Sequence, residues 1–249
     1  MRIPITYSFE ELARFHDLLI EKSGIGEGTV YLQITRGVAP RGHAFPDGAV
    51  PRLTMSIQPF TPDYALRDSG AAAIFVPDER WLRCDIKSIN LLGNLLARQR
   101  AREAGVFEAV LVRSKELFAA RGTAQPGSAA FPGSLDGVVT EGSSTNFFAV
   151  KDGKLHTHPA NHLILRGVSR TIILDQLAPK LGIAAVEKPF DVAFAKSADE
   201  AFASLTTVNV MPLVRLDGAP VGSGKVGPLT RRMMEAFSAL VTSECGSHR

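Results

Sequence analysis

Two Asp-Gly pairs constrain the fold of this chain more than any other feature of its sequence. Asp152-Gly153 interrupts "NFFAVKDGKLHTHP", and Asp217-Gly218 interrupts "FASLTTVNVMPLVRLDGAPVG". An Asp-Gly pair supplies the positive φ angles of a tight hairpin turn, so each pair predicts two antiparallel strands. Helices also alternate with strands, but without a strict βαβ rhythm. The predicted class is therefore α+β, or irregular α/β.

Residues 1–64 predict a small α+β domain. In "SFEELARFHDLLIEK", Ser8 and Glu11 have the spacing of a helix capping box. "TVYLQITRG" and "RLTMSIQPF" alternate apolar and polar side chains and predict two strands, joined by the Gly/Pro loop "GVAPRGHAFPDG". "FTPDYALRDSG" is polar and broken, and we interpret it as the linker to a larger domain.

Residues 65–249 predict that larger domain. The apolar patterns predict two strands, at 71–77 and 108–113. They also predict three helices, at 89–105, 165–182 and 227–241. Residues 114–137 are rich in Ala, Gly, Pro and Ser without a usable period, so they predict a loop.

Composition excludes several classes of protein. Among 249 residues, 28 Lys and Arg face 25 Asp and Glu, and the basic cluster "RQRAREAG" is most simply a solvated helix face, so no nucleic-acid partner is expected. No apolar run approaches the roughly 18 residues that span a bilayer, so no membrane partner is expected. Cys84 and Cys245 have no metal-ligand or disulfide-framework spacing. These features predict a cytoplasmic protein without a metal site.

Lys87 is the first candidate for chemistry, in "RWLRCDIKSINLLGN". A buried lysine loses its proton readily, and the neutral amine attacks carbonyl carbon to form a Schiff base. The alternative is an ordinary lysine that touches solvent. On spacing alone, the solvent-exposed alternative is favoured.

Three further stretches carry candidates in the larger domain. Glu141 follows an apolar run in "VVTEGSSTNFF", where a carboxylate could hold a proton on a ring nitrogen, or where a turn could simply join two strands. In "ILRGVSR", Ser169 opens a helix whose free N–H groups could seat a phosphate, and an ordinary helix start is equally compatible. Thr206 ends a strand in "SLTTVNVMP"; its hydroxyl could complete that seat, although threonine is common in strands.

A fourth stretch lies in the smaller domain. Arg41 and His43 share the loop "APRGHAFP". A guanidinium and an imidazole two residues apart can clamp a carboxylate, with the arginine making a two-pronged contact. A histidine in such a loop can also be incidental.

Together these motifs resemble one family over residues 1 to about 240. The chain is similar to the fold-type IV pyridoxal-phosphate aminotransferases, and most similar to the D-amino-acid transaminases among them. The resemblance rests on motifs that occur in the order of that family: "TRGVAPRGHAFP", "RWLRCDIKSINLLGN", "VTEGSSTNFFAVKDGKLHTHPANHLIL", "GVSR" and "GKVGPLTRRM".

The resemblance implies a role for each candidate. Lys87 would form the internal aldimine with pyridoxal 5'-phosphate and shuttle protons in ping-pong transamination between D-amino acids, such as D-alanine, and 2-oxo acids, such as 2-oxoglutarate. Glu141 would pair with the pyridine nitrogen. Val168, Ser169 and Thr206 would bind the cofactor phosphate. Arg41 and His43 would bind the substrate α-carboxylate from the partner subunit, which implies a homodimer.

Two departures from the family pattern leave alternatives open. The family has roughly 70 more residues before the opening helix, a large share of a small domain, and they normally supply an arginine and a tyrosine to the site. We therefore expect residues 1–64 to be the remainder of a truncated N-terminal domain. An insertion of about 20 residues lies within 114–137. The alternatives are branched-chain aminotransferase, aminodeoxychorismate lyase and a non-catalytic truncated relative.

Overall fold

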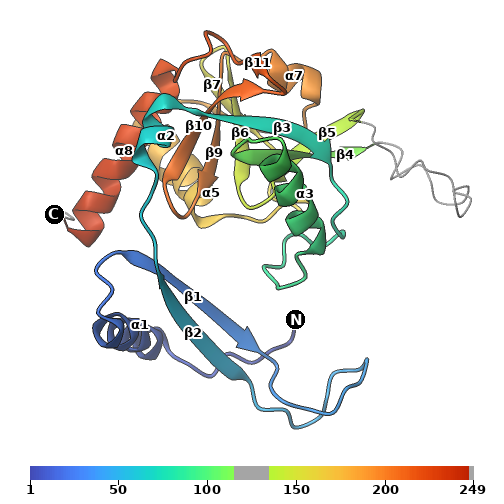
Figure 1. Cartoon of the computed structure of the whole chain (residues 1–249), viewed down its shortest axis with the longest axis vertical. Coiled ribbons are helices and arrows are strands. Elements are labelled where there is room, and N and C mark those ends of the chain that lie inside the picture. The colour runs from blue at the N-terminus through green and yellow to red at the C-terminus, as the bar shows by residue number, and fades with distance from the viewer. Residues whose placement is uncertain (115–134, 247–249) are drawn as a thin grey trace, which may run out of the picture. The chain divides into compact units, whose positions relative to one another are not determined.

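The chain divides into two units in a computed structural model that describes residues 1–114 and 135–246 (Figure 1). The first unit is Met1–Pro62 and the second is Asp63–Arg249. Most of the predicted 114–137 loop, residues 115–134, lies outside the described residues. In the described ranges, no helix combines the length and apolar character needed to cross a membrane.

The first unit consists of one helix and a two-stranded antiparallel sheet: α1 (Phe9–Ser23), β1 (Gly28–Thr35) and β2 (Arg52–Pro59). The predicted capping box is confirmed, because the Glu11 N–H donates to Ser8 Oγ and the Ser8 N–H donates to Glu11 Oε2. Gly24 ends α1 in the left-handed region, at φ 65°. Both predicted strands are confirmed.

The second unit contains the larger sheet and the remaining helices. Its elements are α2 (Tyr64–Ser69), β3 (Ala71–Pro77), α3 (Leu92–Glu103), β4 (Glu108–Ser114), β5 (Gly137–Gly142), β6 (Asn146–Lys151), β7 (Lys154–Thr157), α5 (Val168–Ile172), η1 (Ile173–Leu177), α6 (Ala178–Lys180), β8 (Ala185–Glu187), α7 (Val192–Lys196), β9 (Glu200–Leu205), β10 (Asn209–Leu216), β11 (Ala219–Pro220) and α8 (Pro228–Cys245). The backbone of α5, η1 and α6 is continuously helical.

The larger sheet curls because a tight turn joins two strands that are far apart in its order. The strand order is β5-β4-β3-β10-β9-β6-β7-β8, with β11 paired to β10. Residues 142–145 join β5, at the edge, to β6, which lies beyond β4, β3, β10 and β9. The Gly142 N–H donates to the Thr145 carbonyl across this turn. The end of β5 is therefore held beside the start of β6.

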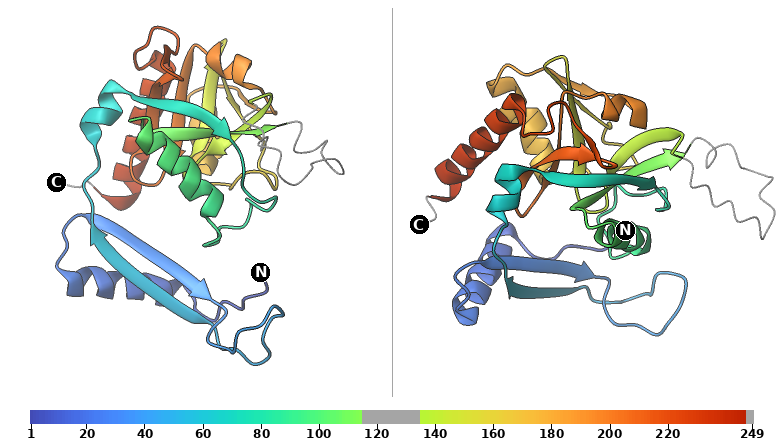
Figure 2. Two further views of the ribbon diagram at one scale, coloured as in Figure 1. Left: turned by 45° about the vertical axis from the view of Figure 1, so that its right-hand side comes forward. Right: turned by 45° about the horizontal axis from the view of Figure 1, so that its top comes forward.

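Apolar side chains pack on both faces of the curled sheet. One face encloses a core drawn mainly from strands, including Phe75, Val112 and Phe147. On the other face, Ala97 and Ala101 of α3 pack on β3 and β4. The 168–180 helix and α8 pack on β6, β9 and β10 through a separate cluster. Figures 1 and 2 show α3 and α8 on different flanks of this unit.

Both Asp-Gly hairpins are confirmed. Asp152 and Gly153 have φ of 50° and 70°, and they join β6 to β7. Asp217 and Gly218 have φ of 49° and 78°, and they join β10 to β11.

The linker interpretation of "FTPDYALRDSG" is wrong for its second half, which forms α2. Asp63 caps this helix, because its carboxylate accepts the Leu66 N–H at 2.8 Å. The stretch has few apolar residues, so its hydrophobic pattern shows no clear helical period. The Asp63 cap and the packing of the partly buried Leu66 against the core stabilise the short helix.

Candidate functional site

Glu141 lies at the centre of a buried polar cluster in the second unit. It is a residue of β5 itself rather than of the turn that follows, and it is only 5% exposed. Its Oε1 accepts from Arg80 Nη1 at 2.5 Å, and its Oε2 accepts from Asn146 Nδ2 at 2.8 Å. The Leu165 N–H lies 3.1 Å from both oxygens. The carboxylate is thus held from three sides.

Arg80 reaches Glu141 because a second carboxylate orients it. Asp78, at the end of β3, accepts from Arg80 Nε and Nη2, both at 2.9 Å. One edge of the guanidinium is therefore bound to Asp78, and the remaining nitrogen, Nη1, is directed to Glu141. Two-pronged contacts of this kind fix the plane of the guanidinium as well as its distance.

Arg113 balances the charge of this cluster. Its Nη2 lies 3.2 Å from Asp78 Oδ1, and its Nη1 donates to the Arg80 carbonyl at 2.9 Å. Two arginines thus face two carboxylates away from solvent, where an unpaired charge would cost several kcal/mol. The cluster joins the ends of β3, β4 and β5.

The pKa values of the two carboxyl groups in the cluster are shifted in opposite directions. Burial raises the pKa of Glu141 to about 7, which outweighs the attraction of Arg80. Burial also acts on Asp78, but the hydrogen bonds and charge of Arg80, together with Arg113 and Thr140, outweigh it and lower the Asp78 pKa. The pKa of Arg80 is raised because the hydrogen bond and charge of Asp78, with the charge of Glu141, outweigh burial. Of these two carboxyl groups, Glu141 is therefore the one that gains or loses its proton near neutral pH.

Lys87 is exposed on the loop of residues 78–91 between β3 and α3. A second loop, 158–167, ties this loop to the Glu141 cluster. The Cys84 N–H donates to the His162 carbonyl at 2.8 Å, and Arg80 Nη2 donates to the Leu163 carbonyl at 3.1 Å. Lys87 is therefore accessible to solvent in this structure, on a loop anchored to the cluster.

The predicted phosphate seat lies at the start of the 168–180 helix. Gly167 is the N-cap, and no side chain caps the first N–H groups. Ser169 Oγ donates to the Leu205 carbonyl at 3.1 Å, which brings the helix start to the end of β9. Thr206 follows directly and is exposed, as is Val168. The structure therefore brings Val168, Ser169 and Thr206 together.

Asn146 links the seat to the Glu141 cluster. A Cβ at Gly167 would stand 2.2 Å from Asn146 Oδ1, so any other residue there would displace the Asn146 amide. Asn146 Nδ2 also donates to the Leu165 carbonyl at 2.8 Å. One amide side chain thus contacts Glu141 and the backbone just before the helix start.

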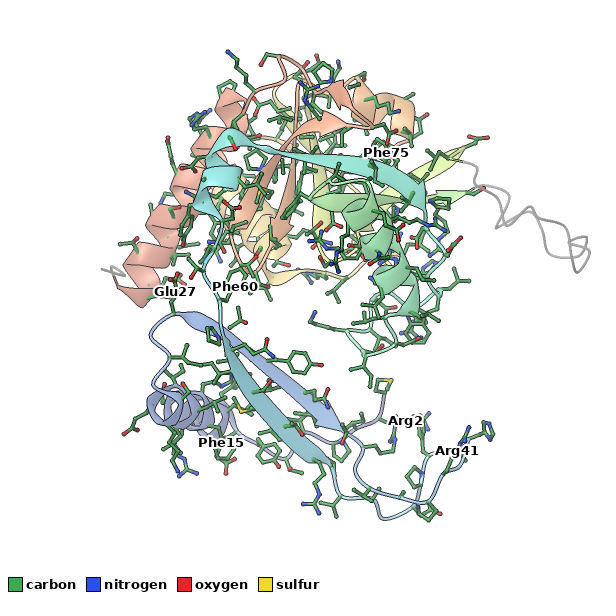
Figure 3. The ribbon with its side chains drawn as sticks, viewed as in Figure 1. Arg2, Phe15, Glu27, Arg41, Phe60 and Phe75 are labelled. Carbon is green, nitrogen blue, oxygen red and sulfur yellow. The ribbon has the colours of Figure 1, made fainter. Side chains whose placement is uncertain are left out.

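Arg41 and His43 lie in the first unit. Both are exposed on the loop of residues 36–51 between β1 and β2, where Figure 3 labels Arg41. In the same loop, Arg36 stacks on Phe45, with 3.7 Å between the guanidinium carbon and the ring centroid.

Sequence reasoning did not identify Asp78, Arg80, Arg113 or Asn146 as site residues. Asp78 and Arg80 directly follow the apolar strand "AAAIFVP", and charged residues at a strand end were the available signal. The described ranges contain no group of three or more His, Cys, Asp or Glu residues that could hold a metal ion.

Comparison with known proteins relates this chain to aminotransferases. The family model for amino-transferase class IV matches residues 1–119 and 133–216. A D-alanine aminotransferase from Staphylococcus aureus (strain COL) is 39% identical over 242 residues, which cover 97% of this chain and 78% of that protein.

Solved structures share the fold. A branched-chain amino acid aminotransferase from Escherichia coli has a TM-score of 0.75 at 27% identity, covering 98% of this chain and 74% of that chain. A branched-chain amino acid aminotransferase from T.th., with pyridoxamine 5'-phosphate, has a TM-score of 0.78 at 23% identity, covering 97% and 74%. At that identity the second likeness shows the fold alone.

The raised pKa of Glu141 predicts a specific pH dependence of stability. The folded state binds the Glu141 proton more tightly than the unfolded chain, so its contribution to the free energy of unfolding falls as pH rises from about 4.5 to about 7. Glu141→Gln has no proton to lose, and this part of the pH dependence is expected to disappear. Denaturant unfolding across that range measures the difference between the two proteins.

The difference isolates Glu141 because other groups remain in both proteins. His158, whose pKa is lowered by burial, contributes with the opposite sign in each of them. Equal pH dependence of the wild type and Glu141→Gln would contradict a raised pKa at Glu141.

Proposed function

The chain belongs to the amino-transferase class IV family, and we propose that it transfers amino groups between D-amino acids, such as D-alanine, and 2-oxo acids, such as 2-oxoglutarate. The observation that carries the proposal is the buried Glu141, held by Arg80 and Asn146 next to an uncapped helix start. The identity with D-alanine aminotransferases supports D-amino acids as substrates. Class IV aminotransferases use pyridoxal phosphate, which we propose as the cofactor of this chain.

The donor and acceptor groups of the site fit that cofactor. A phosphate requires N–H and hydroxyl donors, and the first turn of the 168–180 helix offers its N–H groups beside the hydroxyl of Thr206. The Ser169 hydroxyl, which donates to the Leu205 carbonyl, would turn to the phosphate. A protonated pyridine nitrogen requires a partner that accepts its N–H⁺ hydrogen bond, and Glu141 is a buried carboxylate. Asn146 lies between the two parts. Val168, Ser169, Thr206 and Glu141 would therefore hold the cofactor.

When bound, pyridoxal phosphate supplies an electron sink for the pair released at the substrate α-carbon. Glu141 serves that chemistry by keeping the proton on the ring nitrogen, because a carboxylate stabilises the N–H⁺ form. Burial raises the pKa of Glu141 to about 7, which favours its neutral form, and a protonated ring nitrogen beside it would favour the ionised form instead. Arg80 is bound to Asp78, and its positive charge offsets the repulsion between the Asp78 and Glu141 carboxylates.

Lys87 is the proposed attachment point and proton carrier. A lysine amine can bond covalently to a carbonyl carbon, and once released it can take the proton from the substrate α-carbon. Its loop is anchored through Cys84 to the same 158–167 segment that donates the Leu165 N–H to Glu141. The proposed reaction is ping-pong, with Lys87 acting in both half-reactions.

Arg41 and His43 are proposed to bind the substrate α-carboxylate from the partner subunit of a homodimer. Seven large apolar side chains of the second unit support a second copy as partner. They are exposed by 40 to 74%, and we call them the apolar patch: Trp81, Leu82, Ile89, Leu91, Leu92, Leu95 and Leu96. Large apolar side chains exposed in such number on neighbouring segments are typical of a protein–protein interface.

The distribution of side chains on α3 strengthens this argument. Its inward face presents the small residues Ala97 and Ala101, whereas Leu92, Leu95 and Leu96 point outward, at 68%, 62% and 49% exposure. A surface helix of a monomer normally places its large apolar residues inward. We therefore propose that the apolar patch is part of the dimer interface.

Lys87→Ala tests the proposed function. We expect wild-type protein incubated with pyridoxal phosphate and reduced with borohydride to carry the label on the peptide containing Lys87. The variant should lose the label and at least about 100-fold of its amino transfer from D-alanine to 2-oxoglutarate. Lys154→Ala, which removes another exposed lysine of the same unit, should change neither. Peptide mass mapping and a coupled alanine assay measure both.

Three outcomes would count against the proposal. Label retained in Lys87→Ala would contradict the assignment of that lysine. No transfer by the wild type at saturating cofactor would favour the non-catalytic alternative. Faster transfer from L-leucine or L-valine than from D-alanine would favour branched-chain aminotransferase activity.

Leu95→Glu tests the proposed interface. A charge at the centre of a buried apolar contact is strongly disfavoured, so we expect the variant to run as a monomer by light scattering after gel filtration. Leu95→Met keeps the side chain apolar and should leave the dimer intact. A dimeric Leu95→Glu protein would show that the apolar patch is not the interface.

A further inference from the structure

A second buried carboxylate, Glu108, lies outside the cluster described above. It is the first residue of β4 and is fully buried. Its Oε1 accepts from the Ser143 N–H at 3.1 Å and from Ser143 Oγ at 2.5 Å. Its Oε2 accepts from Thr145 Oγ1 at 3.0 Å and from Ser144 Oγ at 3.4 Å. Its own neighbour, the Ala109 N–H, completes the set.

All these donors except the last belong to one turn, residues 142–145. This turn separates Glu141 from Asn146, the two residues whose side chains meet at 2.8 Å in the proposed site. Three consecutive hydroxyl side chains of the turn are thus directed at one carboxylate. The geometry of the turn fixes where Glu141 and Asn146 stand relative to each other.

The packing around Gly142 shows how closely the turn is held. A Cβ at Gly142 would stand 2.1 Å from Thr145 Oγ1 and 2.9 Å from Glu108 Oε2. The turn is also bound to α3, because the Ser143 carbonyl accepts from Asn94 Nδ2 at 2.7 Å. The helix that follows the Lys87 loop is therefore fastened to the same turn that Glu108 holds.

A carboxylate suits this position better than its amide. Five donors converge on Glu108, and an ionised carboxylate has about four lone-pair positions and no hydrogen to clash with them. A glutamine would direct its NH₂ group at donors on one side. The wrong group there leaves buried donors unpaired and lets the turn shift.

On the basis of the proposed function, we propose that Glu108 is a positioning residue for Glu141: by holding Ser143 and Thr145 it fixes the turn that sets Glu141 against Asn146 and the cofactor ring nitrogen. Glu108 does not touch the cofactor in this account. It acts through the 142–145 turn, and its removal should alter the proton affinity of Glu141.

The test compares Glu108→Gln with Glu200→Gln in protein without cofactor. Glu200 is a matched control: it is 9% exposed and accepts two backbone N–H groups, those of Leu229 and Thr230 at the start of α8. It stands opposite Val150, four ladder positions from Asn146. Both variants should lose stability, and only Glu108→Gln should displace the Glu141 titration.

The readout is the titration midpoint of the Glu141 carboxyl, followed by carbon NMR with Glu141→Gln as the assignment control. We expect Glu108→Gln to shift the midpoint by about one pH unit, a tenfold change in proton affinity, and Glu200→Gln to leave it within a few tenths. The other charged or titratable groups that act on Glu141 are unchanged in both variants: Asp78, Arg80, Cys84 and Arg113.

Ser143→Ala provides a second route if Glu108→Gln fails to fold. It removes the shortest contact to Glu108 and leaves the carboxylate in place. Because both changes act through one turn, Ser143→Ala should shift the midpoint in the same direction, and the double variant should shift it by less than the sum. Midpoints unchanged in Glu108→Gln and Ser143→Ala would overturn the proposal.

A cofactor titration separates this proposal from the proposed function. Glu108→Gln is expected to bind pyridoxal phosphate about tenfold more weakly than Glu200→Gln. If the wild type binds no pyridoxal phosphate while the midpoint shift is present, the proposed function fails and the positioning role of Glu108 stands. If the wild type binds it and the two variants titrate alike, the positioning role fails alone.

Discussion

The guanidinium of Arg80 is the contact on which the site depends. One of its edges is bound to Asp78 and the remaining nitrogen is directed to Glu141, so a single side chain fixes the ends of β3 and β5. Removing one partner of a buried pair costs roughly 3–5 kcal/mol, because the other charge is left uncompensated. A cluster this costly to disturb can hold the proposed partner of the ring nitrogen, Glu141, in one position.

The curl of the sheet brings Asn146 and the start of the 168–180 helix close to the contacts that Arg80 makes with Asp78 and Glu141. The short 142–145 turn joins β5 to β6, which sets Asn146 against Glu141, and Asn146 in turn lies against the glycine before the 168–180 helix. The 158–167 segment adds the Leu165 N–H and anchors the Lys87 loop. The fold therefore connects the proposed ring-nitrogen partner, phosphate seat and amine loop through neighbouring backbone, within one unit.

Local chemistry in the sequence predicted much of this fold. The Ser8–Glu11 capping box, both Asp-Gly hairpins and the helix after Gly167 were predicted, because each depends on residues within a few positions. Asp78, Arg80 and Asn146 were missed as site residues because their importance comes from long-range contacts, such as Arg80 to Glu141. The family resemblance supplied roles for Lys87 and Glu141, but not the residues that orient Glu141.

The central claim is that Glu141 keeps a proton on the ring nitrogen of a bound cofactor. Protein loaded with pyridoxal phosphate labelled with ¹⁵N in its ring tests this most directly, because the nitrogen chemical shift differs between protonated and neutral rings. The account predicts a protonated ring at neutral pH in the wild type and a neutral ring in Glu141→Gln. The same chemical shift in both proteins would contradict it.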